Sequence, residues 1–102
     1  MNKEKALGFL GLLNRGGALL IGDALRLGIK KASLIVLAED AKDATKRFYE
    51  EKASFRAIPI LWMESKEELG HAIGYDEVAA IGVKDQKAAR KLAALLKEGE
   101  EK

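Results

Sequence analysis

The sequence predicts one α/β domain with a parallel or mixed sheet and helices on both of its faces. Three observations lead to this fold class. The chain has 102 residues, which suits a single hydrophobic core. Apolar runs of strand length alternate with segments of helical periodicity. Hydrophobic residues make up 48% and charged residues 33% of the chain, a composition typical of a folded domain.

The first helix is predicted by Ala6, Leu10 and Leu13, whose spacing places them on one helical face. The alternative is a secretory signal, because Lys3 and Lys5 precede this apolar stretch. An acidic residue between these lysines and the lack of a small-residue cleavage site favour the helix. No apolar run reaches the ~18 residues that a membrane span needs, so no membrane association is expected.

The stretch 14–31 is interrupted by four glycines, and each glycine weakens a helix by about 1 kcal/mol. We therefore expect a loop at Gly16 and Gly17, a short extended piece at Leu19 and Leu20, and a second helix from about Asp23 onward.

Three longer runs predict the other strands: 33–37, 58–63 and 78–83. The first two are rich in aliphatic residues, which predicts strands buried on both faces. Trp62 lies inside the second run, so we expect it in the core rather than stacked on a base.

Spacing and capping residues predict the remaining helices. From Ala41 to about Phe55, the apolar Ala41, Ala44 and Phe48 fall on one face. A capping box at 65–68 starts a short helix to about residue 73, which the glycine at 74 closes. In the last helix, Asp85 is the expected cap, and one apolar stripe contains Ala88, Leu92, Leu95 and Leu96.

Several function classes are excluded or unsupported by the residues present. The chain has no cysteine, which excludes disulfides, thiolate metal sites and thiol nucleophiles and favours the cytoplasm. His71 is the only histidine, and we expect it on a helix surface or partly buried. A phosphate loop ending in Gly-Lys-Ser/Thr is missing. We expect no enzyme activity, metal or cofactor.

Charge is distributed unevenly along the chain. Residues 1–31 carry six Lys/Arg against two acids, whereas Lys66 alone opposes five acids over 58–83. Arg26 and Lys30 would be i, i+4 neighbours on the second helix, with Lys31 adjacent, a pattern that indicates phosphate binding. Solvated lysine faces are also common, so the residues alone leave both interpretations open. The backbone at Gly22 and Asp23 is a further candidate phosphate contact.

Four blocks of the chain resemble the ribosomal L-seven-Ae/L-thirty-e superfamily, and within it the bacterial YlxQ-type branch. They are Leu10 to Leu19, Leu34 to Ala41, Ile58-Pro59 and Ser65 to Gly74. The resemblance implies a three-layer α/β/α sandwich with a four-stranded mixed sheet and binding of kink-turn RNA, whose unpaired bases are read by such proteins.

The family's RNA-contacting positions are only partly retained. Glu39 and Asp40 match the end of a strand, Lys66 matches a lysine at a helix start, and 74–79 resembles an apolar loop. The family's Asn-Glu-x-x-Lys element is absent in either possible register, which gives the residues Ala24, Leu25 and Gly28 or the residues Leu19, Leu20 and Asp23. The side chains that would read base edges are lost, which predicts altered specificity.

The sequence thus predicts an RNA-binding domain over 1–98, followed by a charged tail at 99–102. The expected partners are structured RNA of ribosomal or kink-turn-like type and ribosomal proteins, with the chain a monomer. The start of the second helix and the loop before the last strand are expected to share one rim. The predicted RNA contacts are Gly22, Asp23, Arg26, Lys30, Lys31, Glu39, Asp40, Lys66, Tyr75, Glu77, Val78 and Ala79.

The rival prediction is a protein-interaction module that kept the fold but lost RNA recognition. It requires Leu19, Leu20 and Leu25 to be exposed together as one apolar patch.

Overall fold

A computed structural model describes residues 3–97, and their elements follow the alternating order that the sequence predicts. The elements are α1 (Lys3–Arg15), β1 (Leu19–Ile21), α2 (Asp23–Leu27), the 3₁₀ turn η1 (Ile29–Lys31), β2 (Leu34–Ala38), α3 (Asp43–Arg56), β3 (Ile60–Met63), α4 (Lys66–Ala72), β4 (Ala80–Val83) and α5 (Gln86–Lys97). The tail predicted at 99–102 lies outside the described residues.

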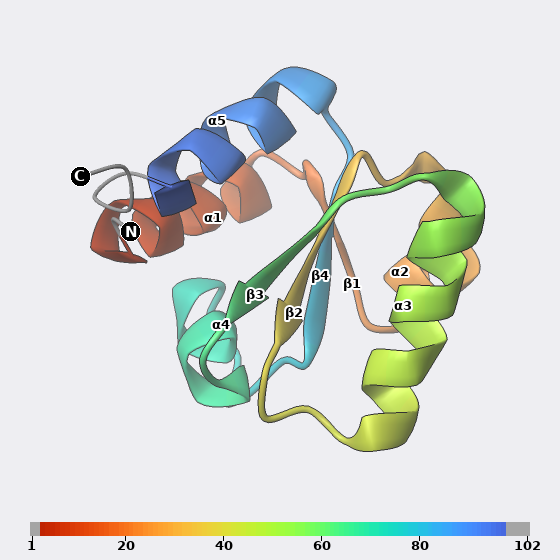
Figure 1. Cartoon of the computed structure of the whole chain (residues 1–102). Helices are drawn as coiled ribbons and strands as arrows, with labels where there is room; N and C mark the ends of the chain where they lie inside the picture. The colour runs from red at the N-terminus through yellow and green to blue at the C-terminus, as the bar shows by residue number, and fades with distance from the viewer. Residues whose placement is uncertain (1–2, 98–102) are drawn as a thin grey trace.

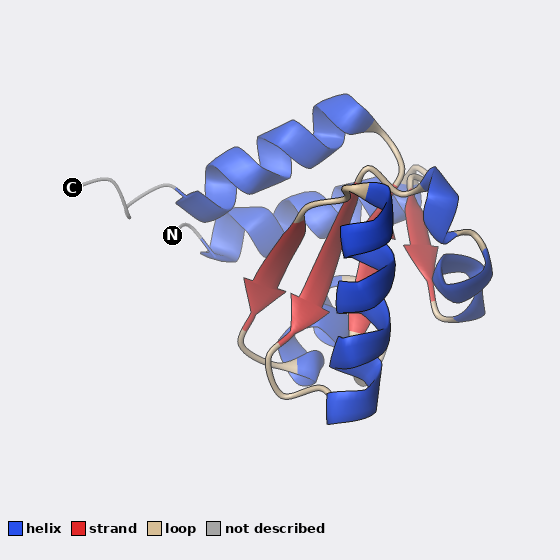
Figure 2. Cartoon of the chain, turned by 45° about the vertical axis from the view of Figure 1, so that its right-hand side comes forward, coloured by secondary structure: helices blue, strands red, loops and turns tan. Residues whose placement is uncertain are grey.

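The four strands form one mixed sheet in the order β1-β4-β2-β3. β4 runs antiparallel to both β1 and β2, whereas β2 and β3 are parallel. Consequently β1, β2 and β3 all begin at one end of the sheet and finish at the other, where β4 begins (Figure 2). The predicted four-stranded mixed sheet is confirmed, and its two ends are the places where loops from distant parts of the chain meet.

Helices cover both faces of the sheet, which completes the three layers. α1, α4 and α5 pack on one face, with α1 and α5 side by side, and α2 and α3 pack on the other (Figure 1). The side chains of each central strand point alternately to the two faces of the sheet. In β2, Val36 packs into the core beneath α1, α4 and α5, whereas Ile35 and Leu37 pack into the core beneath α2 and α3. This alternation is why both central strands are fully buried.

Gly82 in β4 allows α2 to pack closely on the sheet. A Cβ atom at this position would lie 2.5 Å from Cδ1 of Leu25, well inside van der Waals contact. Leu25 is completely buried in the resulting space. The small residue in a central strand therefore fixes the position of α2.

The Ser65, Gly74 and Asp85 caps form as the sequence predicts, but the second half of the capping box does not, because the Glu68 carboxylate pairs with Lys3 instead. Ser65 Oγ accepts a hydrogen bond from the amide of Glu68 (3.1 Å), and Asp85 Oδ2 accepts one from the amide of Ala88 (3.0 Å). Gly74 has a φ of 84°, which turns the chain out of α4, and the next amide donates back to the carbonyl of Gly70 (2.8 Å). This arrangement is the usual glycine-terminated helix end.

Two predictions about the strands are wrong. β3 lies at the edge of the sheet, so only Met63 in it is fully buried, and Trp62 is 36% exposed instead of a core residue. Strand order depends on long-range pairing, which local hydrophobicity does not report. The third predicted strand also begins later, at Ala80 rather than Val78.

The predictions for α2 and α3 also need correction. α2 ends before Gly28, where the chain tightens into η1, so Arg26 and Lys30 do not lie on one helix. α3 begins at Asp43 and buries Tyr49 and Ala53, whereas Ala44 is exposed.

Candidate nucleic-acid interface

Most of the predicted contacts lie at the end of the sheet where β4 begins. Gly22 directly follows β1, Asp40 follows β2 by two residues, and Lys66 lies three residues beyond β3. The loop between α4 and β4 arrives at the same place, because β4 runs antiparallel to its neighbours. We call this end the rim, and it comprises the segments 22–23, 39–43, 64–68 and 75–79.

A hollow of about 310 Å³ opens in the rim where the start of α2 meets the loop before β4. The expectation that these two segments share one side of the molecule is therefore correct for Gly22. The hollow is lined mainly by apolar groups and by backbone. Its lining residues are Ile21, Gly22, Thr45, Tyr49, Tyr75, Glu77, Val78, Ala79 and Ala80.

The loop is held tightly against α4. A Cβ atom on Gly70 would lie 2.5 Å from the Cα of Glu77, so only glycine lets the two backbones approach this closely. The Val78 amide also donates to the carbonyl of Lys66 (3.0 Å). The helix and the loop consequently form one rigid unit at the rim.

Polar contacts tie this unit to the neighbouring strand. The backbone amide of Lys66 donates to Oδ1 of Asp40 (2.8 Å), and the Ala38 amide donates to the carbonyl of Ala79 (2.9 Å). The Lys66 ammonium lies 3.7 Å from Oε1 of Glu77. Asp40 thus helps to cap α4, while the Lys66 charge is shared with the loop.

Tyr49 forms a wall of the hollow and is a residue that the sequence analysis missed. It is 8% exposed, and its burial raises the pKa of the phenol above the ordinary value of 10.0. The phenol is therefore neutral near pH 7. The signal was present in the sequence, because Thr45 and Tyr49 have i, i+4 spacing on α3.

The rim is strongly acidic. Its four segments contain nine carboxylates and two lysines. Two of the carboxylates share one cation from α1, because the Lys3 ammonium lies 2.7 Å from Glu64 and 2.8 Å from Glu68. The hydrogen bond to Glu64 is the main reason that the pKa of Lys3 is raised, and the same bond lowers the pKa of Glu64.

Three predicted cations do not contribute to the rim as expected. Lys30 and Lys31 precede β2, so they lie at the opposite end of the sheet from the loop before β4. Arg26 packs against α3, where its guanidinium lies 5.7 Å from the ring centroid of Phe48. The shared-rim expectation is therefore wrong for Lys30 and Lys31.

The apolar patch required by the protein-interaction prediction does not form. Leu25 and Leu20 are buried, and Leu19 is partly buried against the core. The rival prediction loses its main support. Within residues 3–97 there is also no cluster of three His, Cys, Asp or Glu residues suited to a metal ion. None of the helices described there is long and apolar enough to cross a membrane.

A known protein family matches most of the chain. The profile of the "Ribosomal protein L7Ae/L30e/S12e/Gadd45 family" matches residues 22–93. The chain belongs to this family. The match begins at Gly22 and spans the hollow, the α4 unit and most of α5. The superfamily resemblance seen in the sequence is thus confirmed.

Two curated relatives support the YlxQ-like branch of the family. "RNA-binding protein YlxQ" of Enterococcus faecium is 30% identical over 98 residues, which cover 93% of this chain and 94% of that protein. The protein of the same name from Bacillus subtilis strain 168 is 33% identical, with 85% and 90% covered. Both relatives are named as RNA-binding proteins.

Solved structures show the same family fold. A Bacillus halodurans protein of unknown function superposes with a TM-score of 0.82 at 38% identity, covering 92% of this chain and 98% of that one. The Giardia lamblia 15.5kD RNA binding protein superposes with a TM-score of 0.71 at 20% identity, covering 98% and 89%.

Proposed function

We propose that the chain binds structured RNA and that the rim receives its unpaired bases. The observation that carries this proposal is the hollow that joins Gly22 to the loop carrying Tyr75 and Val78. RNA is recognised mainly where bases are splayed out of a helix and placed on apolar or aromatic groups. An apolar hollow next to a half-exposed tyrosine suits such a base.

The charges of the rim fit base contacts better than backbone contacts. Glu39 and Asp76 are exposed and take no part in any ion pair of residues 3–97, so their carboxylates are available to accept hydrogen bonds from base amino and imino groups. Phosphates would be repelled by the same carboxylates. Lys66 is the rim cation next to the loop, and Glu77 already shares its charge.

Kink-turn-like RNA with altered specificity is the finer part of the proposal. The two registers put Ala24, Leu25 and Gly28, or Leu19, Leu20 and Asp23, at the positions that read bases in the family. Leu25 is fully buried, so it contacts no base. The loop lines the hollow, and Asp40 at the strand end accepts a hydrogen bond from the Lys66 amide, which supports a related RNA rather than an identical one.

The wider setting is also a proposal: a monomer in the cytoplasm that contacts ribosomal RNA or ribosomal proteins. The relatives named as RNA-binding proteins support the RNA partner. The absence of cysteine suits a reducing compartment.

The deciding experiment compares a kink-turn RNA with an unkinked duplex of the same composition in a binding titration. We expect the kinked RNA to bind more tightly, and Tyr75→Ala to weaken it about tenfold, because one stacked base is worth roughly that much. Leu12→Ala is the control, since it removes an exposed apolar side chain on α1 that lines neither this hollow nor the other end of the sheet. Equal binding of the two RNAs, or equal loss in both variants, would argue against the rim.

A further inference from the structure

The end of the sheet opposite the rim gathers positive charge from four separate segments of the chain. The segments that precede β1, β2 and β3 and follow β4 meet there, because the first three strands begin at this end. Segments 15–18, 28–33, 56–59 and 84–90 contain one acid, Asp85, which is occupied in capping α5. We call this end the basic edge, and its cations are Arg15, Lys30, Lys31, Arg56, Lys84, Lys87 and Arg90.

These seven cations are exposed, and none of them forms an ion pair within residues 3–97. By contrast, Lys3, Lys46 and Lys66 form ion pairs, and they lie on or near the rim side. Unpaired cations at one end of a small domain create a local positive potential that attracts polyanions.

Helix stability explains only some of these charges. Arg15 and Arg56 lie at the ends of α1 and α3, where a cation is favoured by the helix dipole. Lys87 and Arg90 lie near the start of α5, where the dipole disfavours them. The other four α-helices carry an acid in the first turn and α5 does not, so its cations serve another purpose.

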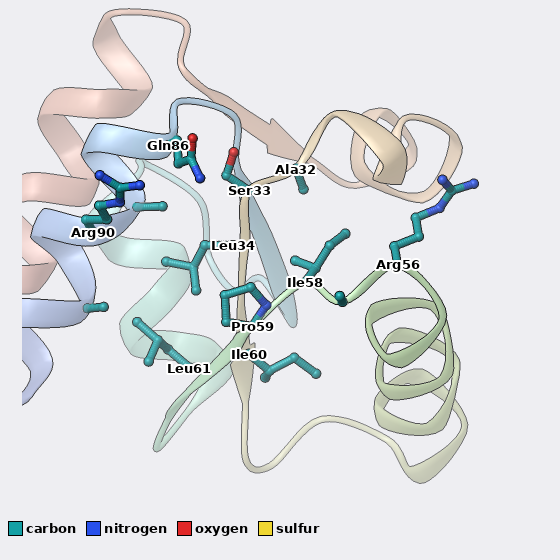
Figure 3. A pocket seen from close by; sticks show the side chains of 13 residues that line it. Ala32, Ser33, Leu34, Arg56, Ile58, Pro59, Ile60, Leu61, Gln86 and Arg90 are labelled. Atoms are coloured by element: carbon teal, nitrogen blue, oxygen red, sulfur yellow. The ribbon is translucent and has the colours of Figure 1, made fainter.

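A groove of about 610 Å³ opens beside the basic edge, between α5 and the end of α3. Arg90 and Arg56 lie on opposite sides of it, and Leu34, Ile58 and Pro59 lie between them (Figure 3). Ser33 also lines the groove, and its hydroxyl donates to the carbonyl of Lys84 (2.8 Å), which connects the groove to the basic edge.

We infer that the basic edge is a second RNA-binding surface, which holds the phosphates of a single-stranded segment and seats a base in the groove. The inference takes its class of partner from the proposed function but uses none of the rim residues. An apolar floor with a guanidinium on each side matches a base flanked by its two phosphates. Arginine also stacks on bases through its planar guanidinium.

RNA fits this surface better than an acidic peptide does. The cations come from four segments of the chain and spread across the end of the sheet, beyond the groove itself, as an extended polyanion requires. The rim repels phosphates, so an RNA whose bases enter the hollow must have its backbone neutralised elsewhere. The domain measures 33 × 28 × 26 Å, a distance that a few nucleotides of single strand can cross.

The test uses a single-stranded oligouridylate of about twelve nucleotides, which matches common site sizes for single-strand binding. Two variants remove two charges each from the basic edge: Arg56→Gln with Arg90→Gln, and Lys30→Gln with Lys31→Gln. The matched control, Arg47→Gln with Lys52→Gln, removes two exposed charges from α3 that belong to neither the rim nor the basic edge. Thermal melting checks that all variants remain folded.

We expect each basic-edge variant to bind oligouridylate about tenfold more weakly than the control, with the salt slope reduced by about 0.7 for each lost contact. Arg56 and Arg90 should matter less for a duplex of equal length, since a paired base does not enter the groove. Unchanged affinity in both variants would overturn the inference. Equal loss with polyglutamate as the ligand would overturn the assignment to RNA.

The two proposals fail in distinguishable ways. If Tyr75→Ala weakens kinked RNA while the basic-edge variants match their control, the rim binds RNA and the basic edge does not. If the basic-edge variants weaken oligouridylate while Tyr75→Ala changes nothing, the second surface holds and the rim is wrong.

Discussion

The rim and the basic edge are the two ends of the same four strands, yet their chemistry is opposite. The rim has nine carboxylates, a hollow, and a loop fixed to α4 by direct backbone contact. The basic edge has seven cations without ion pairs among the described residues, carried by four segments of the chain, and an open groove. The two proposals thus assign base reading and phosphate binding to different surfaces. The net charge of the whole chain, only +2, does not reveal this separation of charge.

The largest effect is expected from Gly70→Ala, which should disturb the rim and leave the basic edge intact. The new methyl group meets the backbone of Glu77 at 2.5 Å, and backbone cannot move aside as a flexible side chain does. We expect a loss of about 2–3 kcal/mol in the free energy of unfolding and loss of kink-turn binding. Oligouridylate binding should survive below the unfolding transition.

Urea unfolding measures this effect, with Gly8→Ala as the control. Gly8 is exposed in α1 and has nothing within 4 Å of an added Cβ, so that substitution should stabilise the helix by about 0.5–1 kcal/mol. Equal destabilisation by both substitutions would show that the contact between α4 and the loop is unimportant.

The next effect comes from neutralising the rim with Glu39→Gln and Asp76→Asn. Removing two unpaired carboxylates should raise the affinity for plain duplex RNA about threefold at low salt, because phosphates are repelled less. Glu50→Gln with Glu51→Gln on α3 removes the same charge outside both ends. An equal gain in this control would mean that total charge matters rather than its position.

A smaller effect is expected at alkaline pH from Tyr49. Because burial raises its pKa, the folded state holds the phenol proton more tightly than the unfolded state does. This contribution to stability is complete below the ordinary value of 10.0 and is lost as pH rises through the folded pKa. Tyr49→Phe should flatten this alkaline loss in thermal melts, and an unchanged pH profile would contradict the assignment.

The smallest effect should follow Lys3→Met, which makes the rim more negative. Without Lys3, the pKa of Glu64 should return toward its ordinary value, because their hydrogen bond is what lowers it. The pair supports folding above the unfolded pKa of Glu64 and ceases to do so as pH falls through the folded one. Carboxyl titration by NMR measures the change, which Lys5→Met should not reproduce.

Local sequence signals predicted most of the fold because they act over short distances. Ser65, Asp85 and Gly74 mark helix ends through contacts within a few residues, and each was placed correctly. Trp62 was misplaced because its exposure depends on β3 having only one neighbouring strand. Strand order is set by pairing between distant residues, which hydrophobic periodicity does not encode.

The candidate site was predicted in part for the same reason. The resemblance supplied Asp40, Lys66 and the loop before β4, and the structure brings them together. The basic cluster was noticed but placed on the wrong side, because Lys30 and Lys31 were assigned to a helix that ends before Gly28. Which loops meet at which end follows only from strand direction.

The central position of β4 has a consequence for how the protein is made. β4 is the last strand in the described chain, yet it pairs with both β1 and β2, and β1 has no other strand beside it. A nascent chain that stops before Ala80 therefore contains only the β2-β3 pair and leaves both helical layers without their central support. Folding must wait until β4 (Ala80–Val83) has been synthesised, so we expect nascent chains that lack it to depend on chaperones.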